Sequence, residues 1–370
     1  MYVKKLQLIN FRNYEDLNIE LNKGVNIFIG DNAQGKTNIL EAIYYCSLAK
    51  SHRTNRDKEL INWNSDEAYM QSYISRERLD KNIDIKIFKD GKKGIRINKI
   101  KVTKIQELIG VFNVVLFSPE DLKIVKESPA YRRRFLDIEI CKLNPRYYYS
   151  LVQYNKVLNE RNSLLKKWNG NIEEIIGIYD NQLAKYGSLI IKERLKYIKL
   201  LNDKGKVIHK DITSNAEDIS FKYISSLKSH QNIEEELNLL LKKNLKSDIE
   251  KKITSHGPHR DDFSININDI DTRNYGSQGQ QRTSVLTIKF SSLEIIKEQT
   301  GEYPVLLLDD VLSELDLNRQ KYILNSIKNV QTIITCTGIE NIKSYLDEKS
   351  KIFNVKDGKI NKEFILNQVR

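Results

Sequence analysis

The chain has 370 residues, of which 40% are hydrophobic, enough for the core of one large or two modest domains. Its net charge of +12 favours a polyanionic partner, nucleic acid or a membrane surface, although a lysine-rich composition alone gives the same balance. The odd number of cysteines, three, and the lack of a CxxC pair argue against a disulfide framework. Neither a signal peptide nor an apolar run of transmembrane length is found, so we expect a cytoplasmic protein without a membrane partner.

The N-terminal third alternates short apolar runs with turn residues, which is typical of strands joined by tight connections. A turn rich in glycine and aspartate near residue 91 predicts a hairpin. The predicted elements are strands at Val3–Phe11, Val25–Ile29, Ile83–Phe88, Ile95–Val102 and Val111–Phe117, and a helix at Asn38–Leu48.

Apolar residues recur at helical spacing between Pro129 and Lys252, so this stretch is expected to form a helical arm rather than a long coiled coil. Strand and helix signals alternate again after Lys252. The expected elements are Phe263–Ile267, Arg282–Gln299, Val305–Leu308, Asn318–Ile327 and Thr332–Cys336. The expected domains are a head made of residues 1–128 and 253–370, with residues 129–252 inserted as the arm.

A phosphate-binding loop follows the strand at Val25–Ile29 and precedes a helix. Glycines permit close approach of the backbone, whose N–H groups hold phosphates together with the positive end of the helix dipole. Lys36 would reach the β- and γ-phosphates of ATP, and Thr37 would bind Mg²⁺. The loop reads Gly30, Asp31, Asn32, Ala33, Gln34, Gly35, Lys36 and Thr37.

A second acidic element follows the four apolar residues Val305–Leu308, which suit a strand buried on both faces. Asp309 at its end would hold Mg²⁺, and Asp310 could act as the general base that polarises the attacking water. The alternative interpretation is a pair of helix-capping aspartates.

A serine turn, Ser277–Gln278–Gly279–Gln280, precedes an apolar helix near residue 282. Its hydroxyl and free amides suit a γ-phosphate. Taken alone, the turn is equally consistent with an ordinary helix N-cap.

These motifs, in this order, resemble the ATP-binding-cassette (ABC) superfamily, and the helical insertion resembles its DNA-repair and chromosome-maintenance branch. Within that branch the chain is most similar to the RecF family of bacterial recombination mediators. The segments that carry the resemblance are Asn10–Tyr14, Gly30–Asn38, Ser51–Thr54, Phe117–Leu122, Arg132–Asp137, Gly257–Asp262, Ser277–Arg282 and Asp309–Asp316.

The resemblance implies an α/β fold: an ABC-type P-loop ATPase head, with a mostly parallel sheet, flanking helices and an antiparallel β subdomain, and an inserted helical arm. It implies an ATP- and Mg²⁺-dependent homodimer in which Ser277 and Gly279 of one subunit contact the γ-phosphate held by the other. Asn38 and Gln280 belong to the same motifs, Arg12 would lie near the nucleotide, and Asp316 matches the loop that links the two sites.

The same resemblance implies a role in recombinational repair and replication restart. The dimer would bind double-stranded and gapped DNA near the nucleoid and, with RecR and RecO, help load RecA. Slow, DNA-dependent ATP hydrolysis would reset it. Two departures from transporter cassettes fit slow turnover: Asp310 replaces a glutamate, and Thr335–Thr337 lacks a histidine. Phe117–Glu120 offers no glutamine where one normally precedes the helical lobe.

Three basic clusters are candidates for DNA phosphate contacts, which would be salt-sensitive and largely independent of base sequence. Each could equally be a solvated charged face, and Asp137 or Glu139 could pair with the third. The first cluster is Lys50, His52, Arg53 and Arg56; the second is Lys89, Lys92, Lys93, Arg96, Lys99, Lys101 and Lys104; the third is Arg132, Arg133 and Arg134.

Two other patterns favour structural roles. Tyr147, Tyr148 and Tyr149 could stack on bases, but their helical spacing favours packing. His256 and His259 lack the spacing of a tetrahedral metal site, so hydrogen bonding is expected. The competing functions are a transporter nucleotide-binding subunit, a scaffold with a decayed ATP site, and a chromosome-structuring ATPase.

Overall fold

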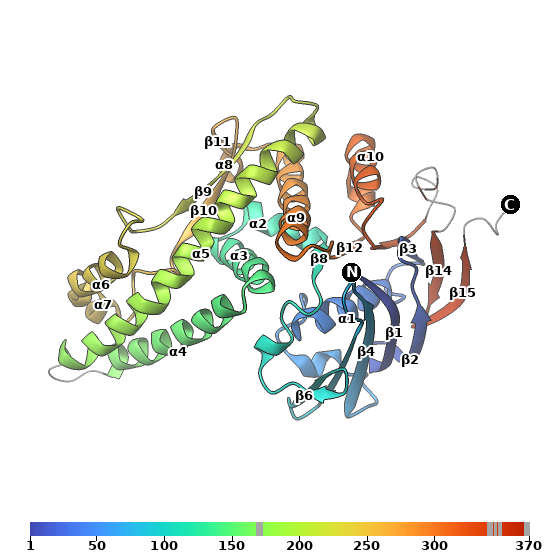
Figure 1. The fold of residues 1–370 in the computed structure, drawn as a ribbon, viewed down its shortest axis with the longest axis horizontal. Helices are drawn as coiled ribbons and strands as arrows, with labels where there is room; N and C mark the ends of the chain where they lie inside the picture. The colour runs from blue at the N-terminus through green and yellow to red at the C-terminus, as the bar shows by residue number, and fades with distance from the viewer. Residues whose placement is uncertain (168–172, 339–342, 344–345, 347–349, 366–370) are drawn as a thin grey trace. The chain divides into compact units, whose positions relative to one another are not determined.

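The computed structural model describes residues 1–167, 173–338 and 350–365, together with Lys343 and Leu346. The chain divides into two compact units, one formed by Met1–Asp121 with Lys289–Arg370 and the other by Leu122–Ile288 (Figure 1). Among the described residues, no helix is both long enough and apolar enough to cross a bilayer.

A mostly parallel six-stranded sheet forms the core of the first unit, in the order β15-β14-β3-β13-β12-β8. β12 and β13 are buried along their whole length, as expected for a sheet covered on both faces. Only β15, at the edge, runs antiparallel to its neighbour. The strands are β3 (Val25–Ile29), β8 (Val114–Phe117), β12 (Val305–Asp309), β13 (Thr332–Cys336), β14 (Lys351–Lys356) and β15 (Lys359–Ile365).

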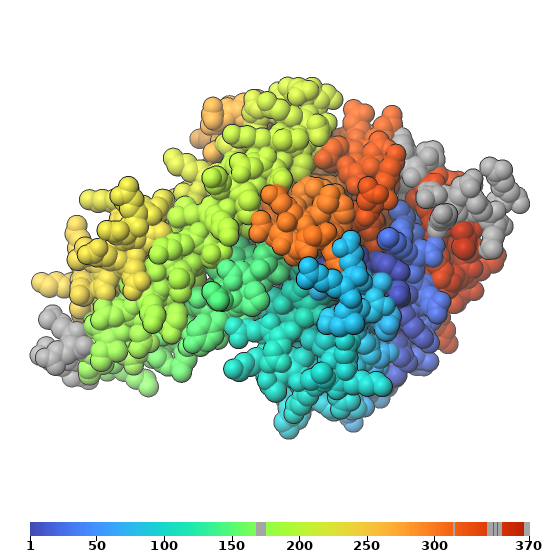
Figure 2. All heavy atoms as spheres, in the orientation of Figure 1, coloured from blue at the N-terminus to red at the C-terminus, as the bar shows by residue number. Residues whose placement is uncertain are grey.

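An antiparallel sheet, in the order β2-β1-β4-β5-β6-β7, makes the second layer of this unit. Alternate residues are buried along β5, so one face of the strand points into the core. The strands are β1 (Tyr2–Phe11), β2 (Tyr14–Glu20), β4 (Glu67–Ser75), β5 (Lys81–Phe88), β6 (Lys93–Ile97) and β7 (Ile100–Lys101). The segment that contains β5–β7, light blue to cyan in Figure 2, forms part of the solvent-facing surface of this unit.

Helix α1 (Lys36–Leu48) packs against strands of both sheets (Figure 1). Nearly every side chain of α1 is buried, because the helix has a sheet on each side. The other helices of the first unit are α10 (Leu317–Ser326) and the short 3₁₀ turns η1 (Asp57–Leu60), η2 (Ile105–Glu107) and η4 (Leu312–Glu314). Another 3₁₀ turn, η3 (Pro119–Leu122), ends where the second unit begins.

The second unit is mainly helical, and its longest element is the 41-residue helix α5. α5 packs against α4, α6 and the strand β9 (Figure 1). The helices are α2 (Lys123–Lys126), α3 (Pro129–Leu143), α4 (Pro145–Lys167), α5 (Glu173–Thr213), α6 (Ile233–Lys243), α7 (Leu245–Lys251) and α8 (Thr272–Tyr275). Helix α9 (Gln278–Thr300) starts in the second unit and ends in the first.

A small antiparallel sheet crosses the boundary expected at residue 252, and the second unit ends at Ile288. β10 (Asp262–Ile267) pairs with β9 (Ile219–Ile224) over six residues and with β11 (Ile270–Asp271). These hydrogen bonds join β10 to a strand that lies within residues 129–252. The stretch expected to form a helical arm therefore contains a strand, and the compact unit to which it belongs runs from Leu122 to Ile288.

Most predicted elements are present, with three local differences. The strand predicted at Val111–Phe117 begins only at Val114, because Val111 and Phe112 lie in a turn. The predicted strand Ile95–Val102 is broken into β6 and β7 by Asn98 and Lys99, both with positive φ. The helix predicted from Arg282 begins at Gln278, so the serine turn lies directly at its first turn.

Candidate nucleotide-binding site

The loop between β3 and α1 depends on two glycines that allow close packing. A Cβ on Gly35, which has φ +112°, would lie 2.6 Å from the side chain of Asn13. A Cβ on Gly30 would lie 2.3 Å from the carbonyl oxygen of Val355. Neither contact is possible for a larger residue, so the loop conformation requires glycine at both positions.

Lys36, the first residue of α1, turns its ammonium group back over the loop. Its Nζ donates to the carbonyl oxygens of Gly30 at 2.5 Å and Asp31 at 2.7 Å. Lys36 makes no ion pair with any carboxylate of the described residues, although only 7% of the residue is exposed. A largely buried cation held only by main-chain oxygens is suited to an incoming anion.

The next residue, Thr37, reaches the end of the buried strand β12. Its Oγ1 donates to Asp309 Oδ1 at 2.8 Å. β12 is not adjacent to β3, since β13 lies between them, and Thr335 of β13 donates to the same oxygen at 2.9 Å. Mg²⁺ prefers oxygen ligands, and here a hydroxyl and a carboxylate oxygen lie together beside a phosphate-binding loop.

Asp310, the proposed general base, directly follows this strand. It has a positive φ of 55°, a conformation that aspartate tolerates better than most residues. Its backbone N–H donates to Thr335 Oγ1 at 3.0 Å. Ser313 donates to its carbonyl oxygen at 2.9 Å, so the turn that carries Asp310 is fixed at both ends.

Gln34 attaches the phosphate-binding loop to the β14–β15 turn. Its carbonyl oxygen accepts from the Asn13 side chain at 3.0 Å and from the Gly358 N–H at 3.1 Å. Its side-chain Oε1 accepts from the Asp357 N–H at 2.7 Å. Asn38 Nδ2 then donates to Asn13 Oδ1 at 2.8 Å, which connects the start of α1 to the same cluster.

Arg12 and Arg53 meet at a buried carboxylate, Glu41 of α1. Arg12 donates two 2.9 Å hydrogen bonds to Glu41, and Arg53 donates one at 3.2 Å. Burial opposes ionisation of Glu41, but hydrogen bonds from Arg12 and Ser51 and both positive charges lower its pKa. This ion-pair cluster fixes two basic side chains beside the loop.

A cavity of about 450 Å³ opens next to these arginines. Its most conspicuous side chain is Trp63, which is 93% exposed. An exposed indole beside polar amides can stack on a planar ring while the amides hydrogen-bond to it. The lining residues are Arg12, Asn13, Asn38, Arg53, Asn62, Trp63 and Asn64.

The serine turn belongs to the second unit, where Ser277 caps α9. Ser277 Oγ accepts from the Gln280 N–H at 3.2 Å, and Gln280 Oε1 accepts from the Ser277 N–H at 2.9 Å, which together form a capping box. The N-cap interpretation is therefore correct, and it does not compete with phosphate binding because Ser277 remains exposed. Gly279 lies within the first turn of α9.

Asp316 also acts as a helix cap. Its Oδ1 accepts from the Arg319 N–H at 3.0 Å at the start of α10, and the two side chains form an ion pair. Partial burial opposes ionisation, but these contacts lower the pKa of Asp316. Its carboxylate is therefore anionic at neutral pH.

The basic clusters differ in how far they are exposed. Arg56 and Lys92 pair with their neighbours Glu59, at 3.9 Å, and Asp90, at 2.9 Å, but their side chains are 74% and 83% exposed and can contact a large anion. Lys93 is less available, because its side chain is only 28% exposed and it donates to the Ala49 carbonyl as well as pairing with Asp57.

Two members of these clusters need correction. Arg132 is buried and donates two hydrogen bonds to Asp262, at 2.7 and 2.9 Å, so it stabilises the second unit instead of facing DNA. Its partner is Asp262, not Asp137 or Glu139. His52 is largely buried, and burial lowers its pKa to about 4, so it carries no charge for DNA at neutral pH. Arg133 is half-buried and donates to the Asp261 carbonyl at 2.9 Å.

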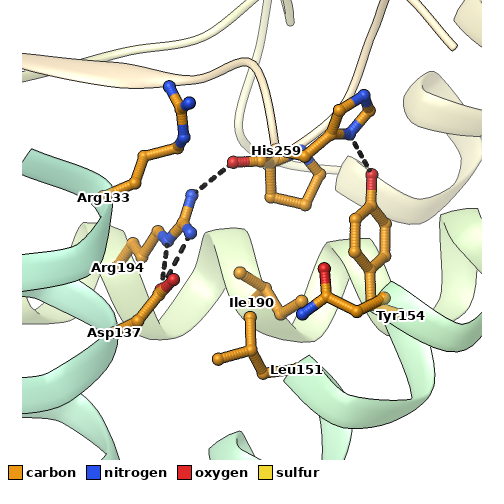
Figure 3. A pocket seen from close by; sticks show the side chains of 9 residues that line it. Arg133, Asp137, Leu151, Tyr154, Ile190, Arg194 and His259 are labelled. Carbon is orange, nitrogen blue, oxygen red and sulfur yellow. Dashed lines mark hydrogen bonds and ion pairs between the residues drawn. The ribbon is translucent and has the colours of Figure 1, made fainter. Parts of the chain in front are cut away.

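The Gly257–Asp262 segment is held by a polar cluster at a cavity of about 140 Å³ in the second unit (Figure 3). Arg194 bridges Asp137, at 2.8 Å, and the Pro258 carbonyl, at 2.6 Å. His259 Nδ1 lies 2.7 Å from the Tyr154 hydroxyl, and its Nε2 lies 3.0 Å from the Thr254 carbonyl. The expected hydrogen-bonding role of His259 is confirmed.

Comparison with known proteins places this geometry in a family. The model of the RecF/RecN/SMC N terminal domain matches residues 2–361. A DNA replication and repair protein RecF from Clostridium novyi is 69% identical, over 98% of this chain and 100% of the relative. One from Clostridium perfringens is 67% identical, over 97% of this chain and 99% of the relative. The chain belongs to the RecF family.

Solved structures agree with that assignment. A structure of the recombination mediator protein RecF-ATP in the RecFOR pathway has a TM-score of 0.91 and 39% identity, covering 98% of this chain and 97% of its own. A RecF-ATPrS structure gives 0.90 and 40%, covering 97% of each chain. An Smc head domain from Pyrococcus furiosus shares the fold, with a TM-score of 0.58 and 17% identity. The ABC-type head expected from the sequence is confirmed for this RecF-family chain.

Several residues at the site were not singled out from the sequence. Trp63 and Glu41 lie outside the segments that carry the resemblance, and Asn13 lies within Asn10–Tyr14 but was given no role of its own. The proximity of Asn13 and Trp63 to the loop depends on packing between segments that are distant in sequence. An isolated tryptophan among polar residues, Asn62–Asn64, is the one signal that could have drawn attention to this cavity.

Proposed function

We propose that this chain binds Mg-ATP at the phosphate-binding loop and that ATP joins two copies into a DNA-binding dimer for recombinational repair. The contact between Thr37 and Asp309 carries the proposal, together with Lys36, whose ammonium group is held by main-chain oxygens and by no carboxylate of the described part of the chain. Three residues from opposite ends of the chain meet there in the arrangement that a metal–triphosphate complex needs.

Each of these residues has a distinct role in the proposal. The ammonium group of Lys36 neutralises the β- and γ-phosphates, and the loop N–H groups hold them. Thr37 and Asp309 hold the Mg²⁺ ion, which neutralises phosphate charge. Asp310 orients and deprotonates water, and its fixed turn keeps the carboxylate at the end of β12.

The cavity with Trp63 is proposed to hold the nucleoside. It is lined by Asn13 and Asn38, the residues hydrogen-bonded to the loop and to each other, so it lies directly beside the phosphate positions. Arg12 and Arg53 are fixed on Glu41 and form its rigid wall. Trp63 would stack on the base, an interaction that does not require a particular hydrogen-bonding pattern.

ATP-dependent pairing is proposed because the serine turn is exposed and Ser277 retains its hydroxyl hydrogen as a donor. Its oxygen accepts one hydrogen bond from Gln280, which leaves the O–H able to donate to a phosphate oxygen. Ser277, Gly279 and Gln280 of one copy would complete the site of the other, and ATP binding would then stabilise the dimer.

Duplex and gapped DNA are the proposed partners, with RecR, RecO and RecA in the same pathway. The support comes from relatives named for DNA replication and repair, from structures described as recombination mediators, and from the net charge of +12. Slow, DNA-dependent hydrolysis would release the dimer. The relatives give no support to a transporter subunit.

DNA binding can be tested with the exposed residues Arg56 and Lys92. We expect Arg56→Gln with Lys92→Gln to weaken binding to gapped duplex DNA, and to lower the salt slope by about two, because each side chain contacts one phosphate. Fluorescence anisotropy at several salt concentrations, with ATP and with ADP, measures both effects. Lys243→Gln with Lys251→Gln removes the same charge from α6 and α7 as a control.

The outcomes separate the two parts of this proposal. An unchanged salt slope in the Arg56 and Lys92 variant would remove these residues from the DNA contact. Equal affinity with ATP and ADP would remove the nucleotide switch, whichever residues contact DNA.

A further inference from the structure

Glu217 lies in the connection between α5 and β9, far in sequence from the serine turn, yet it contacts that turn directly. One carboxylate oxygen, Oε1, accepts a 2.9 Å hydrogen bond from Gln280 Nε2. The other, Oε2, lies 3.4 Å from Nε2 of the fully buried His209. The side chain of Glu217 is only 22% exposed, so its position is restricted from both sides.

These contacts determine which way the amide of Gln280 points. A carboxylate can only accept hydrogen bonds, and the backbone N–H of Ser277 can only donate one. The Gln280 amide nitrogen must therefore face Glu217, and its oxygen must face Ser277 at 2.9 Å. A rotated amide would lose both bonds at once. Glu217 thus fixes the Gln280 side chain, and Gln280 in turn accepts a hydrogen bond from the N–H of Ser277.

We propose that Glu217 is a positioning residue for the serine turn and that it links the end of helix α5 to the composite ATP site; this inference rests on the proposed function of Ser277. Glu217 acts only through Gln280. Without it, the amide of Gln280 can rotate and the capping box opens on one side, so the Ser277 hydroxyl samples orientations that do not meet a phosphate.

The connection to α5 follows from the position of Glu217 in the chain. Helix α5 ends at Thr213, and the left-handed residues Ser214 and Asn215 turn the chain directly into Glu217. His209, in the last turns of α5, also lies 2.8 Å from Thr287 Oγ1 of helix α9. A shift of the end of α5 relative to α9 would therefore move Glu217 and, through it, the serine turn.

Three substitutions at one position test this inference. Glu217→Gln keeps an oxygen that accepts from Gln280, Glu217→Asp keeps the charge but is one methylene too short, and Glu217→Ala removes both. We expect the Asp and Ala variants to raise the dissociation constant of the ATP-bound dimer about tenfold, because one hydrogen bond to a charged group is lost. The Gln variant should have a dissociation constant close to that of the unsubstituted protein. Sedimentation velocity measures dimerisation, and titration with a fluorescent ATP analogue measures binding to the monomer.

Nucleotide binding by the monomer should be unchanged in all three variants, which a general loss of structure would not permit. Asp218→Ala, which removes a neighbouring carboxylate that pairs with Lys210, is the matched control and should dimerise normally. Dimerisation of Glu217→Asp and Glu217→Ala as in the unsubstituted protein, while Ser277→Arg remains monomeric, would overturn the positioning role alone. Normal dimerisation of Ser277→Arg would instead overturn the proposed function.

Discussion

Glu41 illustrates how a single buried charge organises the residues around the candidate site. It is completely buried in α1, and its carboxylate accepts hydrogen bonds from Arg12, Arg53 and Ser51. A buried carboxylate is tolerated only when it is paired in this way. The arginines that wall the cavity are thus held by a residue that cannot contact the ligand itself.

Removing this carboxylate should destabilise the protein. We expect Glu41→Leu to lower the free energy of unfolding by about 3 kcal/mol, near the low end for a broken buried pair, because Arg12 and Arg53 can partly rehydrate. Glu41→Gln should cost less, because its oxygen still accepts from Arg12. Urea denaturation measures both, and Glu15→Gln, on the exposed face of β2, is the control. A loss below 1 kcal/mol in Glu41→Leu would contradict the account.

At the scale of elements, the β14–β15 turn supports the phosphate-binding loop from outside. Gly358 has φ +70°, and a Cβ there would lie 2.2 Å from the Asn13 carbonyl oxygen. Its N–H donates to Gln34. We expect Gly358→Ala to displace this contact and weaken ATP binding at least severalfold, in addition to lowering stability by about 1–3 kcal/mol for the strained backbone.

Gly91 offers a matched control for that substitution. It has a similar positive φ of +86°, but nothing lies within 4 Å of an added Cβ. Gly91→Ala should therefore lower stability by about 1 kcal/mol and leave ATP affinity unchanged. Nucleotide titration and thermal unfolding of the two variants give the comparison. Equal ATP affinity in both variants would show that the turn does not support the loop.

His259 makes the second unit sensitive to pH. Burial lowers its pKa to about 4, below the value of about 6.5 in an unfolded chain. Between these two pKa values only the unfolded state takes up a proton at His259. The stability that His259 contributes is therefore fully present above about pH 6.5 and is lost as the pH falls towards 4. Burial raises the pKa of Asp261 to about 6, which partly offsets the effect.

We therefore expect the midpoint temperature of unfolding to decrease when the pH is lowered from 7 to 5. The decrease should be smaller in His259→Gln. Calorimetry at a series of pH values measures the difference between the two slopes, independently of the stability that the substitution itself costs. His230→Gln, at an exposed position, should leave the slope unchanged. A slope in His259→Gln equal to that of the unsubstituted protein would assign the pH dependence to other groups.

The elements best predicted from the sequence are those with a single strong local signal. The apolar runs of β3, β12 and β13 and the phosphate-binding loop were placed within one or two residues. β2 was missed, although it pairs with β1 directly across the Arg12–Asn13 turn. β4 and β9 were also missed, because each pairs with a strand far along the chain more than it shows a pattern of its own. The partner of Arg132 was missed for the same reason, since Asp262 lies 130 residues away.

At the scale of the whole molecule, the proposed composite site draws on residues from both ends of one chain and on the serine turn of a second copy. Lys36, Thr37 and Asp309 assemble within the first unit, whereas Ser277 belongs to the second. The proposal that Ser277 acts on a second copy accounts for the exposure of this helix cap. It also predicts that neither half of the site is sufficient without the other.

Mixing two inactive variants tests this claim most directly. Lys36→Met removes the phosphate-binding cation but keeps the serine turn, and Ser277→Arg keeps ATP binding but blocks the turn. Sedimentation velocity with Mg-ATP should show each variant alone as a monomer, and an equimolar mixture should form dimers, because one composite site is then intact. Dimers of Ser277→Arg alone, or no dimers in the mixture at any concentration at which the unsubstituted protein pairs, would contradict the account.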